Sequence, residues 1–597
     1  MKNAVVFCSL FFSLVAYGER EATYDVAAYV WPAYHPAERW AELGLFGDGK
    51  GEWQNLYEAV KRCQEDYQGI KPLWGYENEA DPIVVARKID AATAAGVNVF
   101  IYDWYWYGGR PFLEEALDEG FLKAHNCERM RFYLMYANHD VTGLWNNKVG
   151  GEEKNRVIWP AKITDDDWKA IVARWISRYF TKKNYYRIKG CPVLSFYDAS
   201  AFVHWEGLEK ARARIAYLRE EVRRAGFPGL HLQIVAGVED NGWLSPDSVT
   251  VYNWLYRTWG AVNGKTRPLL TYRAWGDLAM GVADEMKTIC EGLGATYFPN
   301  LTIGWDTNSR FPPTETRRLV TKSNPDDFEH FARRVKEWSD RNLPADVPRL
   351  VIINSWNEWT EGSCLEPSDR FGYGYLNALW KVFVEPRAIT TRSQDHSLTS
   401  HFCRPDMHRR AVRQAIAGSV GTAAAESYLT DADPQIRRHA LYTVWERAPE
   451  RGREKANGLR EDADKGVSRL AADILDSNRD VSKVFSGVPL SQDRTVDHEI
   501  LRVRTIVPKG GKFTLPVKIA SDAVELWFAE TPKTKVVVSL NGVPAYEFDP
   551  DIAGGRSFRA DVTRTVRWAA ENAVRVTDET GAEREFPFEV EVLKCGG

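Results

Sequence analysis

Two glutamates and the tryptophans beside them form the densest group of chemically capable residues in the chain. The segment Trp356-Asn357-Glu358-Trp359-Thr360-Glu361-Gly362 follows an apolar run, and Glu366-Pro367 comes shortly after it. Cleavage of a glycosidic bond requires one carboxylic acid that protonates the leaving oxygen and a second carboxylate that acts as nucleophile or base. Retaining enzymes hold these two groups about 5–5.5 Å apart. If Glu358 and Glu361 lie on one helical turn, they share a face, with Cβ atoms about 5–6 Å apart.

The neighbouring tryptophans favour a functional site over the alternative, a solvated acidic turn that caps the next helix. Acidic residues alone would be typical of such a turn. Indole rings are costly to leave in water, so Trp356 and Trp359 indicate an apolar wall beside the carboxyl groups. Such a wall raises the pKa of a carboxyl group, as a general acid requires near neutral pH.

The elements that must position these residues are predicted by alternating apolar and charged amphipathic stretches between residues 24 and 385. This alternation is typical of βα units, and residues 82–95 and 326–341 have helical patterns. Eight strands with intervening helices predict a (β/α)₈ TIM barrel with long loops. The candidate strands begin near Asp25, Val97, Arg131, Pro192, Leu230, Val249, Tyr297 and Leu350.

Most of these apolar runs end in polar or aromatic residues, and catalytic residues of such barrels lie at the C-terminal strand ends. We therefore predict Glu358 and Glu361 as the catalytic pair. For Arg310, binding of an anionic substituent and an ion pair with Asp306 are both open. For the other positions, packing, capping or strand-end hydrogen bonding is the alternative to binding. The predicted substrate-binding residues are Tyr29, His35, Tyr102, Asp103, Trp104, Trp106, Asn138, His139, Tyr197, Asn253, Trp305, Asp306, Arg310, Trp356, Asn357, Trp359 and Glu366.

The chain beyond the barrel has two further patterns. Residues 386–404 are predicted to be a linker. Residues 405–480 contain related segments that begin at Met407, Ile436 and Val467, and two of them follow Asp-Ala-Asp, a plausible helix cap. This pattern predicts a small α-helical HEAT-like repeat segment. Residues 497–595 alternate apolar and polar residues, which predicts an antiparallel β-sandwich, either a sugar-binding module or a spacer.

The N-terminus and the composition limit the cellular context. Lys2 precedes an apolar run and small residues, so residues 1–18 are predicted to be a signal peptide, with Glu19 as the first mature residue. We expect a periplasmic or extracellular protein without stable membrane insertion. A net charge of −4 gives no indication of nucleic-acid binding. The scattered cysteines are not typical of a disulfide framework or a zinc site, and we expect no metal and no cofactor.

The segment from Trp356 to Pro367 resembles the W-N-E-W-x-E-G-x-x-L-E-P signature of WbsX-like proteins, a group also described as glycoside hydrolase family 99-like. The resemblance covers residues 24–385 in order. It also rests on Ala28-Tyr29, Tyr34-His35-Pro36, Gly51-Glu52-Trp53, Gly75-Tyr76, Asp81-Pro82, the aromatic run from Tyr102 to Tyr107, Gly304-Trp305-Asp306-Thr307-Asn308, Arg310 and Tyr373-Gly374-Tyr375-Leu376.

This resemblance implies a mechanism. Family 99 enzymes are retaining, act on α-mannosides, need no metal and carry two catalytic glutamates three residues apart. By that resemblance Glu361 is the general acid/base, and Glu358 deprotonates the 2-hydroxyl of the sugar, which then attacks the anomeric carbon to give a 1,2-anhydro sugar. A direct nucleophilic role for Glu358 is the alternative.

Three functions therefore compete. The first is an exported glycoside hydrolase with a poly- or oligosaccharide substrate. The second is a glycosyltransferase of polysaccharide biosynthesis, which should bind a nucleotide diphosphate, but no GxGxxG segment follows a strand. The third is a noncatalytic carbohydrate-binding protein, which would not need two closely spaced glutamates. The residues favour the hydrolase.

Overall fold

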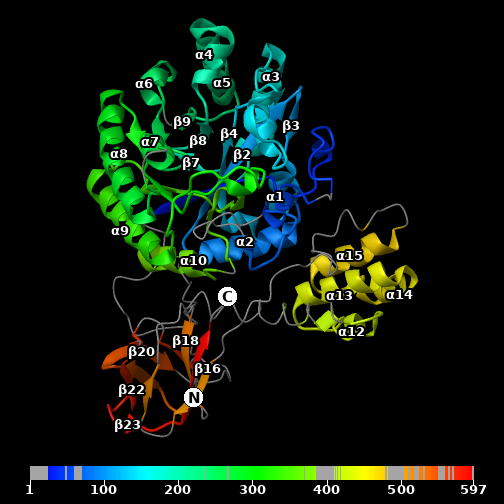
Figure 1. Cartoon of the computed structure of the whole chain (residues 1–597), viewed down its shortest axis with the longest axis vertical. Coiled ribbons are helices and arrows are strands. Elements are labelled where there is room, and N and C mark those ends of the chain that lie inside the picture. Colours follow the sequence, from blue (N-terminus) through cyan, green and yellow to red (C-terminus); the bar gives the residue numbers. More distant parts are fainter. Residues whose placement is uncertain are drawn as a thin grey trace, which may run out of the picture.

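The computed structural model contains a barrel, a helical segment and a sandwich of strands (Figure 1). The predicted signal peptide and the predicted linker lie outside the described residues. The structure describes residues 24–47, 50–59, 70–235, 237–264, 268–368, 370–384, 409, 412, 415–416, 419–476, 481, 503–507, 511–515, 523–528, 532–548, 559–562, 565–567 and 570–593.

All eight predicted barrel strands are confirmed within described residues 24–384, in one parallel sheet of order β11-β10-β9-β8-β4-β2-β1-β13-β12. Helices cover the outer face of a parallel barrel, so its strands are buried on both faces. This burial explains why the strand sequences are continuously apolar. The strands are β1 (Asp25–Val30), β2 (Val99–Tyr107), β4 (Arg131–Tyr136), β8 (Cys191–Phe196), β9 (His231–Val235), β10 (Ser248–Thr250), β11 (Thr296–Tyr297), β12 (Asn300–Thr302) and β13 (Leu350–Asn354).

The sheet closes into a (β/α)₈ barrel because its seventh strand is bent. β11 pairs with β10 and β12 pairs with β13, both in parallel, and only Phe298 and Pro299 separate the two halves. Asn300 Nδ2 also donates to the Val251 carbonyl across this junction at 3.0 Å. The two ends of the sheet are therefore joined through one strand.

The helices around the barrel begin at the caps that their sequences provide. α2 (Pro82–Ala94) starts with a proline after Asp81, whose carboxylate accepts from the Ile83 N–H at 2.8 Å. α9 (Pro325–Asn342) starts in the same way after Asn324. The predicted ranges, 82–95 and 326–341, agree with these helices to within one residue at each end. Other helices of this layer are α3 (Asp165–Arg174), α5 (Leu208–Arg224), α8 (Tyr272–Gly292) and α10 (Gly374–Leu379).

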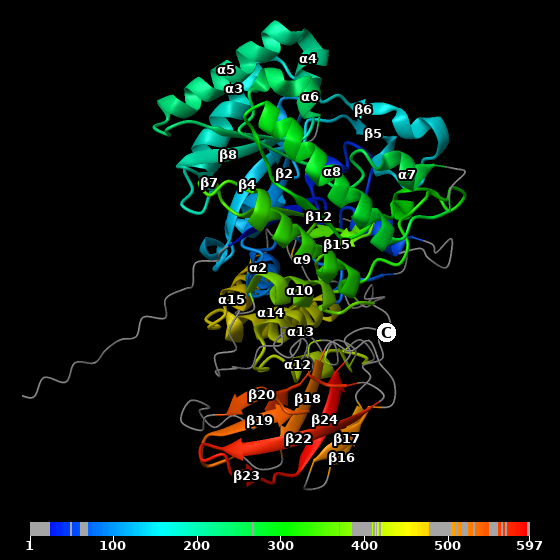
Figure 2. The same ribbon diagram turned by 90° about the vertical axis from the view of Figure 1, so that its left-hand side faces the viewer.

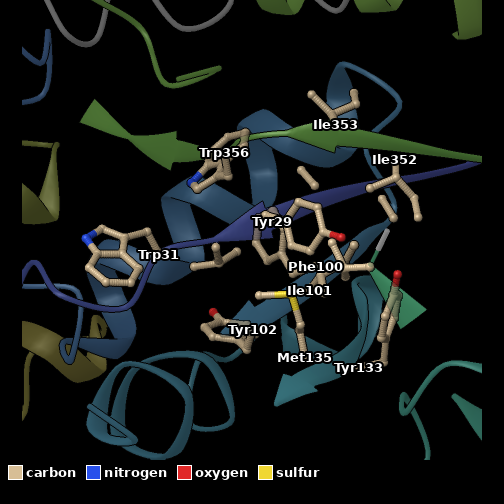
Figure 3. Close-up of a cluster of buried hydrophobic side chains, with 14 of the residues drawn as sticks. Tyr29, Trp31, Phe100, Ile101, Tyr102, Tyr133, Met135, Ile352, Ile353 and Trp356 are labelled. Carbon is tan, nitrogen blue, oxygen red and sulfur yellow. The ribbon is translucent and has the colours of Figure 1, made fainter. Parts of the chain in front are cut away.

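Aromatic and branched side chains fill the barrel near the strands that carry the site. Figure 3 shows Tyr29 among side chains of β2, β4 and β13, including Ile101, Met135 and Ile352. Trp356 lies at the edge of this cluster, with its ring 5.3 Å from that of Phe100. This packing gives the C-terminal strand ends a rigid base.

The predicted helical segment is present and its helices stack, while Met407, where the first predicted repeat begins, lies outside the described residues. α13 (Pro434–Arg447), α14 (Pro449–Leu459) and α15 (Lys465–Leu475) share one core with α12 (Ala423–Glu426). Asp433 and Asp464, the last residues of the two Asp-Ala-Asp segments, accept hydrogen bonds from the first turns of α13 and α15. The predicted caps are therefore present.

This segment packs against α2 of the barrel (Figures 1 and 2). Arg438 forms an ion pair with Asp81, and Arg87 Nη1 donates to Gln435 Oε1 at 3.2 Å. Gly466 of α15 is close to Ile83, because a Cβ at this position would lie 1.6 Å from Ile83 Cδ1. Glycine thus permits the close approach of the two helices.

The C-terminal strands form two antiparallel sheets, as predicted for a β-sandwich. Their inner faces share one apolar core. The predicted domain boundaries at 386–404, 497 and 595 lie outside the described residues and stay predictions. One sheet contains β16 (Val503–Val507), β24 (Phe588–Leu593), β18 (Ala523–Phe528) and β21 (Arg559–Asp561), and the other contains β17 (Lys512–Thr514), β22 (Glu571–Asp578), β19 (Val536–Leu540), β20 (Val543–Phe548) and β23 (Glu583–Arg584).

Candidate active site

The segment after β13 folds back as a short hairpin that carries both predicted catalytic glutamates. β14 (Asn357–Glu358) pairs with β15 (Ser363–Cys364), and the 3₁₀ helix η9 (Trp359–Glu361) joins them. Gly362 follows η9 with φ of 64°, in the left-handed region that glycine adopts without strain. Glu358 immediately precedes this 3₁₀ turn and Glu361 is its last residue, so the turn brings both side chains to the same side of the hairpin.

Asn357 and Glu366 hold this hairpin in place. Asn357 Nδ2 donates to the Trp31 carbonyl at 2.8 Å, and the Trp31 N–H donates to Asn357 Oδ1 at 2.8 Å. Glu366 accepts from Trp359 Nε1 at 2.8 Å and forms a 2.6 Å ion pair with the buried Lys88 of α2. We predicted that Trp359, Asn357 and Glu366 bind substrate. In the structure their contacts fix the position of the hairpin.

A single buried guanidinium joins the two glutamates. Arg310 Nη2 donates to Glu358 Oε1 at 2.7 Å, and Nη1 donates to Glu361 Oε1 at 2.7 Å. Its Nε donates to Glu52 Oε1 at 3.0 Å. Arg310 is the last residue of the 3₁₀ helix η8 (Asn308–Arg310). All three nitrogens therefore contact protein carboxylates, and Arg310 pairs with these glutamates rather than with Asp306.

A fourth acid, Asp103, lies on the other side of Glu358. The Tyr252 hydroxyl lies 2.8 Å from Glu358 Oε2 and 3.3 Å from Asp103 Oδ2. Asp103 comes from β2, and Tyr252 follows β10. Asp103, Glu52, Glu358 and Glu361 thus surround one arginine and one tyrosine, and their formal charges exceed that of the single cation.

Burial and mutual repulsion raise the pKa values of these acids. The pKa of Glu358 rises to about 8, because burial disfavours its charge and Glu361 lies nearby, although Arg310 opposes this effect. Burial also raises the pKa of Glu361, and Arg310 lowers it. Burial, followed by the charge of Glu358, raises the pKa of Asp103 well above its usual range. The site therefore retains carboxylic protons at neutral pH.

The two glutamates differ in their free oxygens. Both carboxylate oxygens of Glu358 accept hydrogen bonds, from Arg310 and Tyr252. Glu361 uses Oε1 for Arg310, while its buried Oε2 has no partner among the described residues. The Glu361 side chain is 13% exposed, against 2% for Glu358. Glu361 is thus the glutamate that has an oxygen available to a bound molecule.

Aromatic rings surround Tyr252 and include several predicted residues. The rings of Tyr29 and Tyr197 lie 4.6 and 5.7 Å from that of Tyr252. His139 packs 5.4 Å from Tyr197, and burial lowers its pKa, so this imidazole is neutral near pH 7. The structure therefore brings Tyr29, Asp103, His139, Tyr197 and Arg310 together with the glutamate pair.

Three other predicted residues of β2 point away from the site. Side chains alternate along a strand, so Asp103 and Tyr105 face inward while their neighbours face the helices. Trp104 Nε1 donates to Glu114, and Trp106 Nε1 donates to Asp167 of α3. The Tyr102 ring packs 5.4 Å from Phe121. Tyr102, Trp104 and Trp106 therefore contribute to packing outside the barrel.

Further predicted residues make local hydrogen bonds. Asn138 Nδ2 donates to the Asp198 carbonyl at 2.6 Å, and Asn253 Oδ1 accepts from the Leu255 N–H at 3.0 Å. Asp306 Oδ1 accepts from the N–H of Asn308 at 2.9 Å and so stabilises the turn that presents Arg310. These side chains shape loops at the strand ends.

His35, Trp305 and Trp356 are buried in the packing around the barrel. His35 has no exposed surface, and its Nδ1 lies 3.1 Å from the Pro36 carbonyl oxygen. Trp305 is buried, and its carbonyl accepts from the Val320 N–H at 2.9 Å. Trp356 packs on Phe100 rather than beside the glutamates, so the apolar wall that we expected from it lies elsewhere.

Two residues of the site were not among the predicted site residues. Glu52 binds Arg310, and Trp31 Nε1 donates to its other oxygen. Tyr252 bridges Glu358 and Asp103. Glu52 lies in Gly51-Glu52-Trp53, a segment of the WbsX resemblance, and Tyr252 immediately precedes the predicted Asn253 at a strand end. Both signals were visible in the sequence, although neither identified the bonding partner.

The fold and this geometry define a (β/α)₈ barrel protein with a candidate acid–base site at the C-terminal strand ends. The chain belongs to the family described as Glycosyltransferase WbsX, whose model matches residues 26–379. It is 25% identical over 396 residues to the uncharacterized protein WxcX of Xanthomonas campestris pv. campestris strain B100, which covers 64% of this chain and 51% of that protein. The chain thus spans about half the length of this relative.

Solved structures with a related chain trace were also found. A glycoside hydrolase-like protein is 14% identical, covers 61% of this chain and 94% of its own, and has a TM-score of 0.41. The GH99 endo-alpha-mannosidase of Bacteroides thetaiotaomicron is 14% identical, covers 60% of this chain and 95% of its own, and has a TM-score of 0.37.

The described residues add two observations on context. No helix among them is both long and apolar enough to cross a membrane. Within the same residues, no group of three or more histidine, cysteine, aspartate or glutamate side chains has an arrangement that could hold a metal ion.

Proposed function

We propose that this chain is an exported, retaining glycoside hydrolase with a poly- or oligosaccharide substrate. The observation that carries the proposal is that the Arg310 guanidinium bridges the two glutamates, with one hydrogen bond of 2.7 Å to each. One guanidinium can bridge two carboxyl groups only if they are close, and retaining enzymes hold their two carboxyl groups about 5–5.5 Å apart.

In this proposal Glu361 is the general acid and base. Its Oε2 has no protein partner among the described residues, and its side chain is the more exposed of the two. Burial raises the pKa of Glu361, which favours the protonated form that a general acid requires. The resemblance to family 99 assigns the same role to the second glutamate of the motif.

Glu358 is the base or nucleophile. Arg310 and Tyr252 donate to its two oxygens and favour the ionised form, whereas burial and Glu361 raise its pKa to about 8. Glu358 therefore acts in the fraction of molecules in which it is ionised. As a base it would remove the proton from the 2-hydroxyl of the sugar, whose oxygen would then attack the anomeric carbon and give a 1,2-anhydro sugar. As a nucleophile it would bond to the anomeric carbon itself. The family resemblance favours the base.

The charge of the site argues against a transferase that uses a nucleotide sugar. Three acids, Glu52, Glu358 and Glu361, contact all three nitrogens of Arg310, and a fourth acid, Asp103, shares Tyr252 with Glu358. A diphosphate needs several N–H donors or cations. In this acidic site it would be repelled, whereas a neutral sugar ring would not.

The test is hydrolysis of an array of plant, algal and host glycans, with α-mannans included, by wild type, Glu358→Gln and Glu361→Gln. We expect cleavage by wild type and a loss of about a thousandfold in each variant, because acid–base and nucleophilic groups contribute factors of this size. The matched control is Glu337→Gln on the exposed side of α9, which should keep wild-type activity.

The anomer that forms first, followed by NMR, tests retention. A substrate with a good leaving group, such as a glycosyl fluoride, should restore turnover to Glu361→Gln but not to Glu358→Gln. A substrate without the 2-hydroxyl should resist cleavage if the 1,2-anhydro route is used. Full activity of both glutamine variants would contradict the site assignment, and sugar transfer from a nucleotide donor without hydrolysis would contradict the hydrolase.

A further inference from the structure

Tyr252 lies between two carboxyl groups but has only one proton to donate. Its oxygen is 2.8 Å from Glu358 Oε2 and 3.3 Å from Asp103 Oδ2. A hydroxyl group donates one hydrogen bond and accepts others. If both contacts are hydrogen bonds, one carboxyl group accepts the Tyr252 proton and the other must itself carry a proton and donate it to the Tyr252 oxygen.

The surroundings of the two acids decide which of them carries the extra proton. Glu358 has a guanidinium donor on its other oxygen, at 2.7 Å. Asp103 is buried, its Oδ1 has no partner, and no cationic group in the described part of the chain bonds to it. A buried carboxylate without a cation or a full set of donors is strongly disfavoured. The proton therefore belongs on Asp103.

The groups that face Asp103 from the neighbouring elements are neutral or acidic. They are Tyr29 of β1, Tyr105 of β2, Tyr197 after β8, Tyr252 after β10, Glu358 of β14 and Glu361 of η9. The charge of Glu358 further opposes ionisation of Asp103. Arg310 is directed at three glutamates instead.

We propose that Asp103 is a neutral carboxylic acid that donates to the Tyr252 oxygen and thereby directs the Tyr252 proton to Glu358. Asp103 is thus a positioning residue, because it acts on Glu358 through Tyr252. This inference deepens the proposed function and rests on it for the role of Glu358. If Asp103 were ionised, it would compete with Glu358 for the only Tyr252 proton, and Glu358 would lose one of its two donors.

Infrared difference spectroscopy tests the protonation of Asp103 without any substrate. A protonated carboxyl group has a C=O stretch that a carboxylate lacks. We expect such a band at pH 7 that shifts when aspartate is ¹³C-labelled and disappears in Asp103→Asn. In Glu358→Gln the band should disappear at a lower pH than in wild type, because the repelling charge is removed. The matched control is Asp306→Asn, since Asp306 is a buried aspartate that accepts N–H donors, and this variant should keep the band.

Kinetics test whether Asp103 acts through Tyr252. Asn can donate to the Tyr252 oxygen and Leu cannot, so Asp103→Leu should lose about tenfold more kcat than Asp103→Asn, the usual effect of one hydrogen bond. In a Tyr252→Phe background the two substitutions should be equivalent. Absence of an Asp103-dependent band at pH 7 would overturn the inference, as would an equal loss in Asn and Leu. If no glycan is cleaved, the kinetic test fails with the proposed function while the infrared result stands.

Discussion

Replacement of Glu358 by glutamine should make the stability of the barrel much less dependent on pH. The pKa of Glu358 rises from the ordinary value of 4.5 to about 8 in the folded protein. Between these two values the folded state binds more protons than the unfolded state, so stability falls as the pH rises. The contribution of Glu358 is fully present below pH 4.5 and is lost as the pH passes 8. Glutamine has no proton to lose and should not show this decrease.

The size of the effect follows from the two pKa values. Each pH unit between 4.5 and 8 corresponds to about 1.4 kcal/mol. Over this window wild type should therefore lose about 4 to 5 kcal/mol relative to Glu358→Gln. Glutamine also weakens the contact with Arg310, which lowers stability by a constant amount. The expected result is thus two curves that converge or cross as the pH rises, rather than a uniform gain.

The assay is urea unfolding at pH values from 4 to 9, followed by the fluorescence of the barrel tryptophans. Unfolding of the helical segment and the sandwich must be separated from that of the barrel, because a chain with several domains need not unfold in one step. Glu337→Gln, on the exposed side of α9, is the matched control and should run parallel to wild type. Parallel curves for wild type and Glu358→Gln would refute the view that burial raises the pKa of this group.

Three further predictions follow from the contacts of the site and from the N-terminus. Arg310→Met removes the cation that lowers the pKa values of Glu358 and Glu361, so the alkaline limb of the pH–activity profile should move to higher pH. The value of kcat should fall at least about a hundredfold. An unchanged profile would contradict this prediction. Lys88→Met leaves the buried Glu366 without its cation and should destabilise the protein by about 3–5 kcal/mol in urea unfolding. Lys336→Met on α9 removes the more exposed ion pair with Asp340 and should cost about 1 kcal/mol or less. In a secreting host the exported protein should begin at Glu19 by N-terminal sequencing, and an intact Met1 would contradict cleavage.

Strand and helix positions could be predicted because they depend on local patterns. The apolar runs at Asp25, Arg131 and Leu350 begin at the observed first residues of β1, β4 and β13. The helical patterns at 82–95 and 326–341 begin within one residue of α2 and α9. The spacing of Glu358 and Glu361 likewise indicated that they lie close together, although the 3₁₀ helix in the hairpin begins only after Glu358.

Side-chain direction and partners could not be predicted in the same way. Tyr102, Trp104 and Trp106 were expected at the site with Asp103, but a strand alternates its side chains, and only every second residue of β2 faces inward. The sequence also could not show that Arg310 and Glu52 meet, because they are far apart in the chain and are brought together only by the closed barrel. Residues with clear local roles, such as Asp306, resemble binding residues when only their strand-end position is known.

The surplus of acid over cation in the site is costly for folding, and this cost favours a catalytic interpretation. A structural ion-pair network would be more stable with as many cations as carboxyl groups, or with apolar residues in their place. Here Glu52, Glu358 and Glu361 share the three nitrogens of Arg310, while among the described residues Asp103 has only Tyr252 as a hydrogen-bond partner. The two glutamates thus have different environments. Glu358 receives donors on both oxygens, and Glu361 Oε2 has no hydrogen-bond partner in the part of the chain that the structure describes. Two carboxyl groups with different proton affinities are what hydrolysis of a glycoside requires.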